Sequence, residues 1–204
     1  MNSLNKFNKN SIRLLISAVL LLIAVGVWST YLLKENIPTV TENGRALIGG
    51  SFNLTNHLNK PVTEKDFSGK YMILYFGYTY CPDICPMDLQ ILTDAINLLD
   101  SSISGQITPI FVSVDPERDT VEIMAEYVQY FHEDLIGLTG TIEQVDAVKE
   151  EYRVYAEKAD DTADYIVDHT SYTYLMGKDG KFLKHFNHAE DPEVMAAQIT
   201  SLIN

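Results

Sequence analysis

Cysteine is scarce in this sequence of 204 residues, which contains only Cys81 and Cys85. Two thiols cannot build a multi-disulfide scaffold, and they fall short of the four thiolates of a closed structural zinc site. Hydrophobic residues make up 46% of the chain, enough to bury one sizeable core, so disorder and repeat arrays are poor descriptions. The two cysteines therefore act together, within one ordinary domain.

Basic side chains are also scarce once the first 34 residues are passed. Those 34 residues hold Lys6, Lys9, Arg13 and Lys34 and no acid, whereas the remaining chain carries 11 basic and 28 acidic side chains, a formal charge of −17. A domain this acidic repels phosphate backbones and anionic lipid headgroups. Nucleic-acid binding is therefore disfavoured.

Charge is absent from residues 14–33 (LLISAVLLLIAVGVWSTYLL). At about 1.5 Å per residue, a helix of this length covers the roughly 30 Å hydrocarbon core of a bilayer, so the run predicts a transmembrane anchor. The preceding basic residues predict that residues 1–13 are cytoplasmic. A cleaved signal peptide is the alternative, although no A-x-A-like triplet follows the run. Residues 34–46 are predicted to be a polar linker, and residues 47–204 an exported domain in which a disulfide can form.

The exported domain alternates strand-like and helix-like segments. Nearly continuous apolar runs predict buried strands at residues 71–78 and 107–114, with a helix at 88–99 between them. Two further helix starts are predicted from capping-box spacing, at Asp119 with Glu122 and at Thr141 with Gln144. A last helix is predicted from the pair Asp191 and Pro192. Residues 172–176 and 181–186, on either side of the glycine-flanked turn 177–180, predict a hairpin. This order predicts an α/β sandwich with a thioredoxin-like fold.

The two cysteines lie between a predicted buried strand and the helix that follows, where reactive groups collect in α/β sheets. Pro82 and Pro86 predict that the pair sits in a stiff loop, with Pro86 at the first helical position and Cys85 beside the helix N-terminus. A helix N-terminus lowers the pKa of a thiol. Three roles remain open: a structural disulfide, thiol-disulfide exchange, and a soft-metal site.

The sequence contains features that favour or disfavour each of these three roles. A disulfide closing so short a loop contributes on the order of 2 kcal/mol or less. Exchange enzymes of this fold carry two residues between their cysteines, not three, and a proline facing them; here no proline occurs between Glu117 and Asp191. Two thiolates favour Cu(I) or zinc, and an imidazole would complete a trigonal copper site. His169, just before the predicted hairpin, occupies the place of the missing proline.

The other histidines are interpreted more simply. His57 and His132 are expected to be solvated or satisfied in the core, and His185 and His188 to be surface residues with at most an accessory metal contact. Asp168 is expected to be an outer partner that fixes the orientation of the His169 ring.

Four blocks of the sequence carry a recognisable pattern in unbroken order: residues 75–86 (YFGYTYCPDICP), 114–120 (VDPERDT), 137–140 (GLTG) and 168–175 (DHTSYTYL). Together they resemble the SCO/SenC family of copper chaperones. The resemblance implies a membrane-tethered thioredoxin-like protein that binds copper, as Cu(I) with Cu(II) as a second form, through Cys81, Cys85 and His169. It implies no catalytic turnover. It also implies delivery of copper to the dinuclear centre of cytochrome c oxidase subunit II, with a thiol reductase and an upstream copper donor as further partners and thiol reduction as a secondary role.

Some acidic and basic residues of these blocks have ordinary structural explanations. Asp119 is expected to cap a helix with Arg118 as its ion-pair partner, and Asp83 to shape the cysteine loop through its own backbone. Asp115, at a strand end, is the candidate to border the copper loop. The N-terminus lacks a long Arg- and Ser-rich extension, which favours a bacterial inner membrane and periplasm over the mitochondrial intermembrane space.

Overall fold

The structure is a computed structural model, and it describes residues 14, 16–25, 28, 47–160, 162 and 164–203. Residues 16–25 are helical, and none of the helices in the described ranges combines the length and apolarity that a membrane crossing requires. The expected cytoplasmic segment 1–13 and linker 34–46 lie outside the described residues, as does part of the expected anchor at 14–33. Residues 47–204 form one compact unit.

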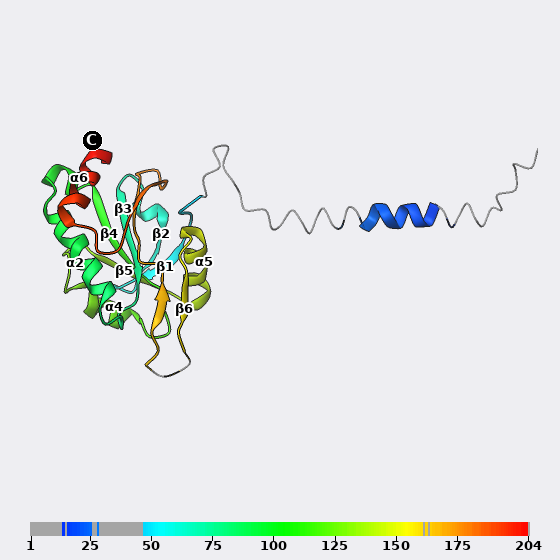
Figure 1. The fold of residues 1–204 in the computed structure, drawn as a ribbon, viewed down its shortest axis with the longest axis horizontal. Coiled ribbons are helices and arrows are strands. Elements are labelled where there is room, and N and C mark those ends of the chain that lie inside the picture. Colours follow the sequence, from blue (N-terminus) through cyan, green and yellow to red (C-terminus); the bar gives the residue numbers. More distant parts are fainter. Residues whose placement is uncertain are drawn as a thin grey trace, which may run out of the picture. The chain divides into compact units, whose positions relative to one another are not determined.

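A seven-stranded sheet runs through this unit (Figure 1). Its spatial order is β2-β1-β5-β4-β3-β8-β9, in which the central strands β3, β4 and β5 are parallel and the outer pairs are antiparallel. The strands are β1 (Asn53–Asn56), β2 (Pro61–Thr63), β3 (Tyr71–Gly77), β4 (Ile107–Ser113), β5 (Ile136–Thr139), β8 (Thr173–Met176) and β9 (Phe182–Phe186). A separate antiparallel pair is made by β6 (Ala156–Lys158) and β7 (Val167–His169).

Helices cover both faces of the sheet. In Figure 1, α2 (Ile84–Asn97), α4 (Val121–Val128) and α6 (Pro192–Ile203) lie on one side, and α5 (Ile142–Tyr152) lies on the other. Two short pieces, η1 (Glu64–Phe67) and α3 (Ser101–Ser104), join neighbouring elements. The predicted strand-helix-strand order is confirmed, and the hairpin β8–β9 forms where it was predicted.

The core follows from the apolar runs of the two central parallel strands. Ile73 and Tyr75 on β3 and Phe111 on β4 are fully buried, as expected for strands with helices on both faces. The rings of Tyr75 and Phe111 stack at 6.4 Å between centroids. This pair joins the two strands near the carboxyl edge of the sheet.

Of the predicted helix starts, those of α5 and α6 are confirmed. Thr141 and Gln144 form a reciprocal capping box at α5, and α6 begins at Pro192. The prediction that Asp119 caps α4 is wrong, because Thr120 is the N-cap and accepts from the Ile123 amide. Both residues suit the cap chemically, but the side chain of Asp119 points into the protein, where it is fully buried.

Candidate metal centre

The topology brings three separate segments to one edge of the sheet. β3 ends at Gly77, and the chain continues through Cys81 to α2. β8 runs antiparallel to β3, with Thr173 opposite Tyr75, so β8 begins at the edge where β3 ends. His169 is the last residue of β7, four residues before Thr173, and it is thereby delivered beside the cysteines.

Cys85 lies inside α2 rather than in the loop that was expected to hold both cysteines. The helix begins at Ile84, two residues before Pro86, since the first amides of a helix have no intrahelical acceptor and a proline is tolerated among them. Cys81 remains in the loop. One thiol is thus fixed on a helix and buried, while the other is half-buried at the loop surface.

Gly77 allows the end of β3 to approach the first turn of α2. A Cβ atom added at this position would lie 2.8 Å from Cys85 Sγ and 3.0 Å from the ring of Tyr75. No ordinary side chain fits without moving the thiol, so this glycine keeps Cys85 at its present depth.

The three candidate ligands form one cluster. Sγ of Cys81, Sγ of Cys85 and a ring nitrogen of His169 all lie within 4.8 Å of one another. Cys85 Sγ is 3.3 Å from His169 Nε2, and the Cys85 amide donates to Cys81 Sγ at 3.4 Å. Both thiols are free. Sequence reasoning therefore selected residues that the fold does bring together.

The two thiols have opposite electrostatic environments. The pKa of Cys81 is well below its ordinary value because the Cys85 thiol donates to its sulfur, with further support from backbone amides, against the opposing effect of burial. The pKa of Cys85 is raised because its proton is shared with Cys81 and because the group is buried. In the metal-free pair, Cys81 is the thiolate and Cys85 keeps the proton.

The orientation of the His169 ring is fixed from its other nitrogen. Nδ1 lies 3.0 Å from the carbonyl oxygen of Thr170, which assigns the proton to Nδ1 and leaves the Nε2 lone pair facing the thiols. The rings of Tyr75 and Tyr78 are nearly perpendicular to the His169 ring, at centroid distances of 6.3 and 5.8 Å. Asp168, the expected outer partner, is exposed, and the Thr170 carbonyl takes that role.

The cluster opens to solvent through a shallow cavity of about 260 Å³. Cys81 and His169 line it together with the apolar Ile84 and Ile166 and the acidic Asp83. The expected turn-shaping bond of Asp83 is absent, since its side chain makes no capping hydrogen bond to α2. A group of modest size can therefore approach Cys81 and His169 from outside, while Cys85 stays covered.

The remaining histidines lie outside the cluster. His57 Nδ1 accepts from the Gly137 amide and His132 Nδ1 from the Asp134 amide. The His185 ring is 4.6 Å from the ring of Tyr172 between centroids. The remaining ring is that of His188, whose Nδ1 is 3.0 Å from the buried carboxylate of Asp88, a contact that the sequence did not predict.

Comparison with known proteins identifies the family of this chain. The SCO1/SenC family model matches residues 40–204. The chain belongs to the SCO1/SenC family. The human protein SCO1 homolog, mitochondrial, is 45% identical over 161 residues, which cover 78% of this chain and 54% of the human protein. The SCO1 homolog 1, mitochondrial, of Arabidopsis thaliana is 47% identical over 149 residues, covering 72% and 45%. The chain thus spans about half the length of these curated relatives.

Solved structures of SCO proteins match the fold of this family member. Arabidopsis thaliana ScoI with copper bound has a TM-score of 0.70 at 44% identity, covering 76% of this chain and 98% of that one. Bradyrhizobium japonicum ScoI with copper bound has the same TM-score at 40% identity, covering 76% and 99%. The mixed α/β fold of residues 47–204 is therefore the thioredoxin-like fold of SCO proteins.

Sequence reasoning missed a polar network next to the cluster. Arg118 pairs with Asp115 rather than with Asp119, and Asp119 instead accepts from Thr79, two residues before Cys81. Tyr165 joins the network by donating to Asp115. The sequence does contain a signal for this network: four of the residues 115–119, directly after a buried strand, are charged. That is more charge than a segment needs in order to start a helix.

Proposed function

We propose that this protein binds one copper ion through Cys81, Cys85 and His169 and acts as a copper chaperone in cytochrome c oxidase assembly. The observation that carries the proposal is the convergence of two sulfurs and one imidazole nitrogen within 4.8 Å, from segments more than 80 residues apart. Soft thiolates with one imidazole favour Cu(I) over hard cations. The copper-bound SCO structures of Arabidopsis and Bradyrhizobium, similar in fold and sequence, support the same cargo.

The burial of the three groups supports transfer rather than storage. The half-buried Cys81 and His169 face the cavity, whereas Cys85 is fully covered. An incoming ligand from a recipient can displace the two outer groups in turn while Cys85 holds the ion. We propose that the recipient is the dinuclear copper centre of cytochrome c oxidase subunit II, and that an upstream donor loads the site.

The test is a Cu(I) titration of the reduced full chain in detergent, in competition with a chromogenic Cu(I) chelator. We expect one ion per chain, with weaker binding in Cys81→Ser, Cys85→Ser and His169→Ala. His185→Ala serves as the matched control, because it removes an imidazole that lies outside the cluster. Equal affinities for wild type and His169→Ala would overturn the three-ligand site. Transfer is tested by adding the copper-free soluble domain of subunit II, separating the two proteins and measuring the copper bound to each.

A second function, thiol-disulfide exchange, is favoured by one observation, the lowered pKa of the half-buried Cys81 next to a protonated Cys85. A thiolate that is both accessible and paired with a second thiol can reduce a disulfide. This activity would depend on both cysteines and persist in His169→Ala. An insulin-reduction assay with that variant separates the two functions, since copper binding depends on His169 and exchange does not.

We also propose that residues 14–33 anchor the protein in the inner membrane with residues 47–204 in the periplasm, or in the intermembrane space if the source is mitochondrial, as the names of the curated relatives have it. Support comes from the 20 residues without charge and the basic residues before them. The intact mass of the membrane-extracted protein tests this directly. A mass lacking the first 30 or so residues would show a cleaved signal peptide instead.

A further inference from the structure

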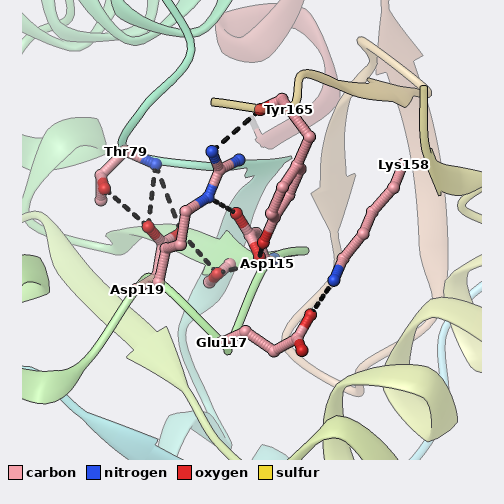
Figure 2. A network of polar contacts seen from close by, with 8 residues as sticks. Thr79, Asp115, Glu117, Asp119, Lys158 and Tyr165 are labelled. Atoms are coloured by element: carbon pink, nitrogen blue, oxygen red, sulfur yellow. Dashed lines mark hydrogen bonds and ion pairs between the residues drawn. The ribbon is translucent and has the colours of Figure 1, made fainter. Parts of the chain in front are cut away.

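The segment Asp115–Asp119, directly after β4, forms one tight turn beside the cluster. The amides of Arg118 and Asp119 both donate to the carbonyl of Asp115, at 3.2 and 2.9 Å. Four side chains of this turn, those of Asp115, Glu117, Arg118 and Asp119, bond to two other parts of the chain (Figure 2). Among the described residues, none of their hydrogen bonds reaches Cys81, Cys85 or His169.

Hydrogen bonds to Asp119 hold the segment that leads to Cys81. The carboxylate of Asp119 accepts from the amide of Thr79 at 3.2 Å and from its hydroxyl at 2.6 Å. The same carboxylate accepts from the hydroxyl of Ser113 at 2.6 Å. Because Thr79 lies only two residues before Cys81, these bonds fix where the chain leaves β3.

Contacts of Arg118 and Asp115 hold the β6–β7 hairpin, which ends in His169. Nη1 of Arg118 donates to the carbonyl of Tyr165 at 2.8 Å, and the guanidinium carbon lies 3.6 Å from the centroid of the Tyr165 ring. The Tyr165 hydroxyl donates to Asp115 at 2.6 Å, and Asp115 also accepts from Arg118 Nε. Figure 2 shows the side chains of Asp115 and Tyr165 close together, and Tyr165 lies two residues before β7 begins.

The hairpin has little backbone pairing to hold it in place, and it is attached by the packing of Val167 in the core and by contacts such as these. Its strands have three residues each and pair only with one another among the described strands, and an isolated two-stranded hairpin is at best marginally stable. Lys158 on β6 also pairs with Glu117 of the same turn. That pair is exposed, so it contributes little, whereas Asp115 is buried and Arg118 largely so.

Arg118 is placed for aromatic contact rather than for a full set of hydrogen bonds. Its Nη2 is buried and has no hydrogen-bond partner among the described residues, which ordinarily carries an energetic penalty. The guanidinium carbon instead lies 3.6, 4.9 and 5.6 Å from the ring centroids of Tyr165, Tyr80 and Tyr78, a cation–π environment. Tyr78 also packs its ring against His169. Arg118 is thereby linked to His169 both through the hairpin backbone and through the Tyr78 ring.

We infer that the Asp115–Asp119 turn sets the separation between Cys81 and His169, and that Arg118 is a positioning residue for His169. The inference rests on the proposed copper site and extends it to a group outside the ligand set. Partners that orient a metal-binding histidine typically change metal affinity by about 10- to 100-fold. Loss of Arg118 should therefore release the hairpin and cost about tenfold in Cu(I) affinity.

The experiment is a double-mutant cycle on Cu(I) affinity, measured on the full chain in detergent for wild type, Arg118→Met, His169→Ala and the double variant. We expect Arg118→Met to weaken binding about tenfold in the wild-type background and less than twofold in the His169→Ala background, because its effect passes through His169. Lys181→Met is the control for the lost positive charge, since that residue forms an exposed ion pair with Asp179; it should leave the affinity unchanged.

The outcomes separate the inference from the proposed function. If wild type and His169→Ala bind equally, the three-ligand site fails. If those two differ but Arg118→Met matches wild type, or weakens binding equally in both backgrounds, the positioning role is overturned. Should Arg118→Met not fold, the same cycle with Tyr165→Phe decides, because that change removes one hydrogen bond and keeps the ring. We expect Tyr165→Phe to weaken binding only when His169 is present, and equal loss in both backgrounds would again overturn the inference.

Discussion

The buried carboxyl of Asp119 predicts an unusual dependence of stability on pH. Its side chain is fully buried, and burial raises its pKa to about 6, although hydrogen bonds from Ser113 and Thr79 oppose the shift. In the unfolded chain the pKa of an aspartate is near 3.8. Between these values the folded protein holds a proton that the unfolded chain has released.

The sign of the effect follows from this difference. Because the folded state binds more protons in this window, the free energy of unfolding falls as pH rises from about 4 to about 6, and levels off above. A difference of about two pKa units corresponds to about 3 kcal/mol. Thr79 and Ser113 remain hydrogen-bonded to the carboxyl group in both protonation states. We therefore attribute the change in the free energy of unfolding to the buried charge.

The assay is urea unfolding of wild type and Asp119→Asn, followed by near-ultraviolet circular dichroism at pH values from 4 to 7.5. Asparagine keeps the shape and one acceptor oxygen but cannot ionise, so we expect the stability of wild type relative to the variant to decrease by about 2 kcal/mol between pH 4 and pH 7. The rest of the change lies below pH 4, because the carboxyl of the unfolded chain is already partly ionised there. Exposed carboxyls such as Asp66 and Glu143, whose pKa values are lowered by helix-start hydrogen bonds, titrate in both proteins and cancel. Parallel pH curves for the two proteins would refute the reasoning.

Three further predictions follow from the geometry of the site and its frame. The pKa of Cys81 is low mainly because Cys85 donates to it, so in Cys85→Ala the pH midpoint of Cys81 alkylation by iodoacetamide should rise toward about 8.5; an unmoved midpoint would show that the donor is elsewhere. Gly77→Ala drives a methyl to 2.8 Å from the Cys85 sulfur and should cost about 1–3 kcal/mol in urea unfolding while weakening Cu(I) binding, and a variant equal to wild type in both would contradict the close approach. Thr141→Ala removes the capping box of α5 and should cost about 1 kcal/mol of stability with Cu(I) affinity unchanged, so a loss of affinity would mean that the site depends on α5.

Hydrophobic patterning predicted the central strands because their sequence meets a strong physical constraint. Residues 72–77 and 107–113 are buried on both faces, and only strands covered by helices on each side require such continuous apolar runs. The hairpin at β8–β9 was equally predictable, since Gly177 and Gly180 frame its turn. The site residues followed from topology, because the carboxyl end of β3 and the entry to β8 meet at one edge.

Local rules failed where several residues satisfied the same rule. Asp119 and Thr120 are both good helix caps, and only burial and the partners Thr79 and Ser113 decide that Thr120 caps and Asp119 turns inward. Pro86 is compatible with any of the first helical positions, so it could not fix the helix start, and Cys85 was placed outside the helix. In both cases the deciding contacts come from segments distant in sequence, which single-sequence periodicity does not contain.

The predictions for Asp119 and Cys85 were wrong because contacts from distant segments decide where these residues lie. The candidate metal site is also assembled through such contacts. The protein holds its most accessible groups, Cys81 and His169, on a loop and on a short hairpin, neither of which is rigid by itself. We infer that rigidity comes from the Asp115–Asp119 turn, which follows β4 of the sheet and bonds to other segments through four charged side chains. A site assembled in this way keeps its ligands close together before metal arrives, yet leaves the two outer ligands on elements that can move apart when one fastening is released. That combination fits the copper transfer that we propose for this protein.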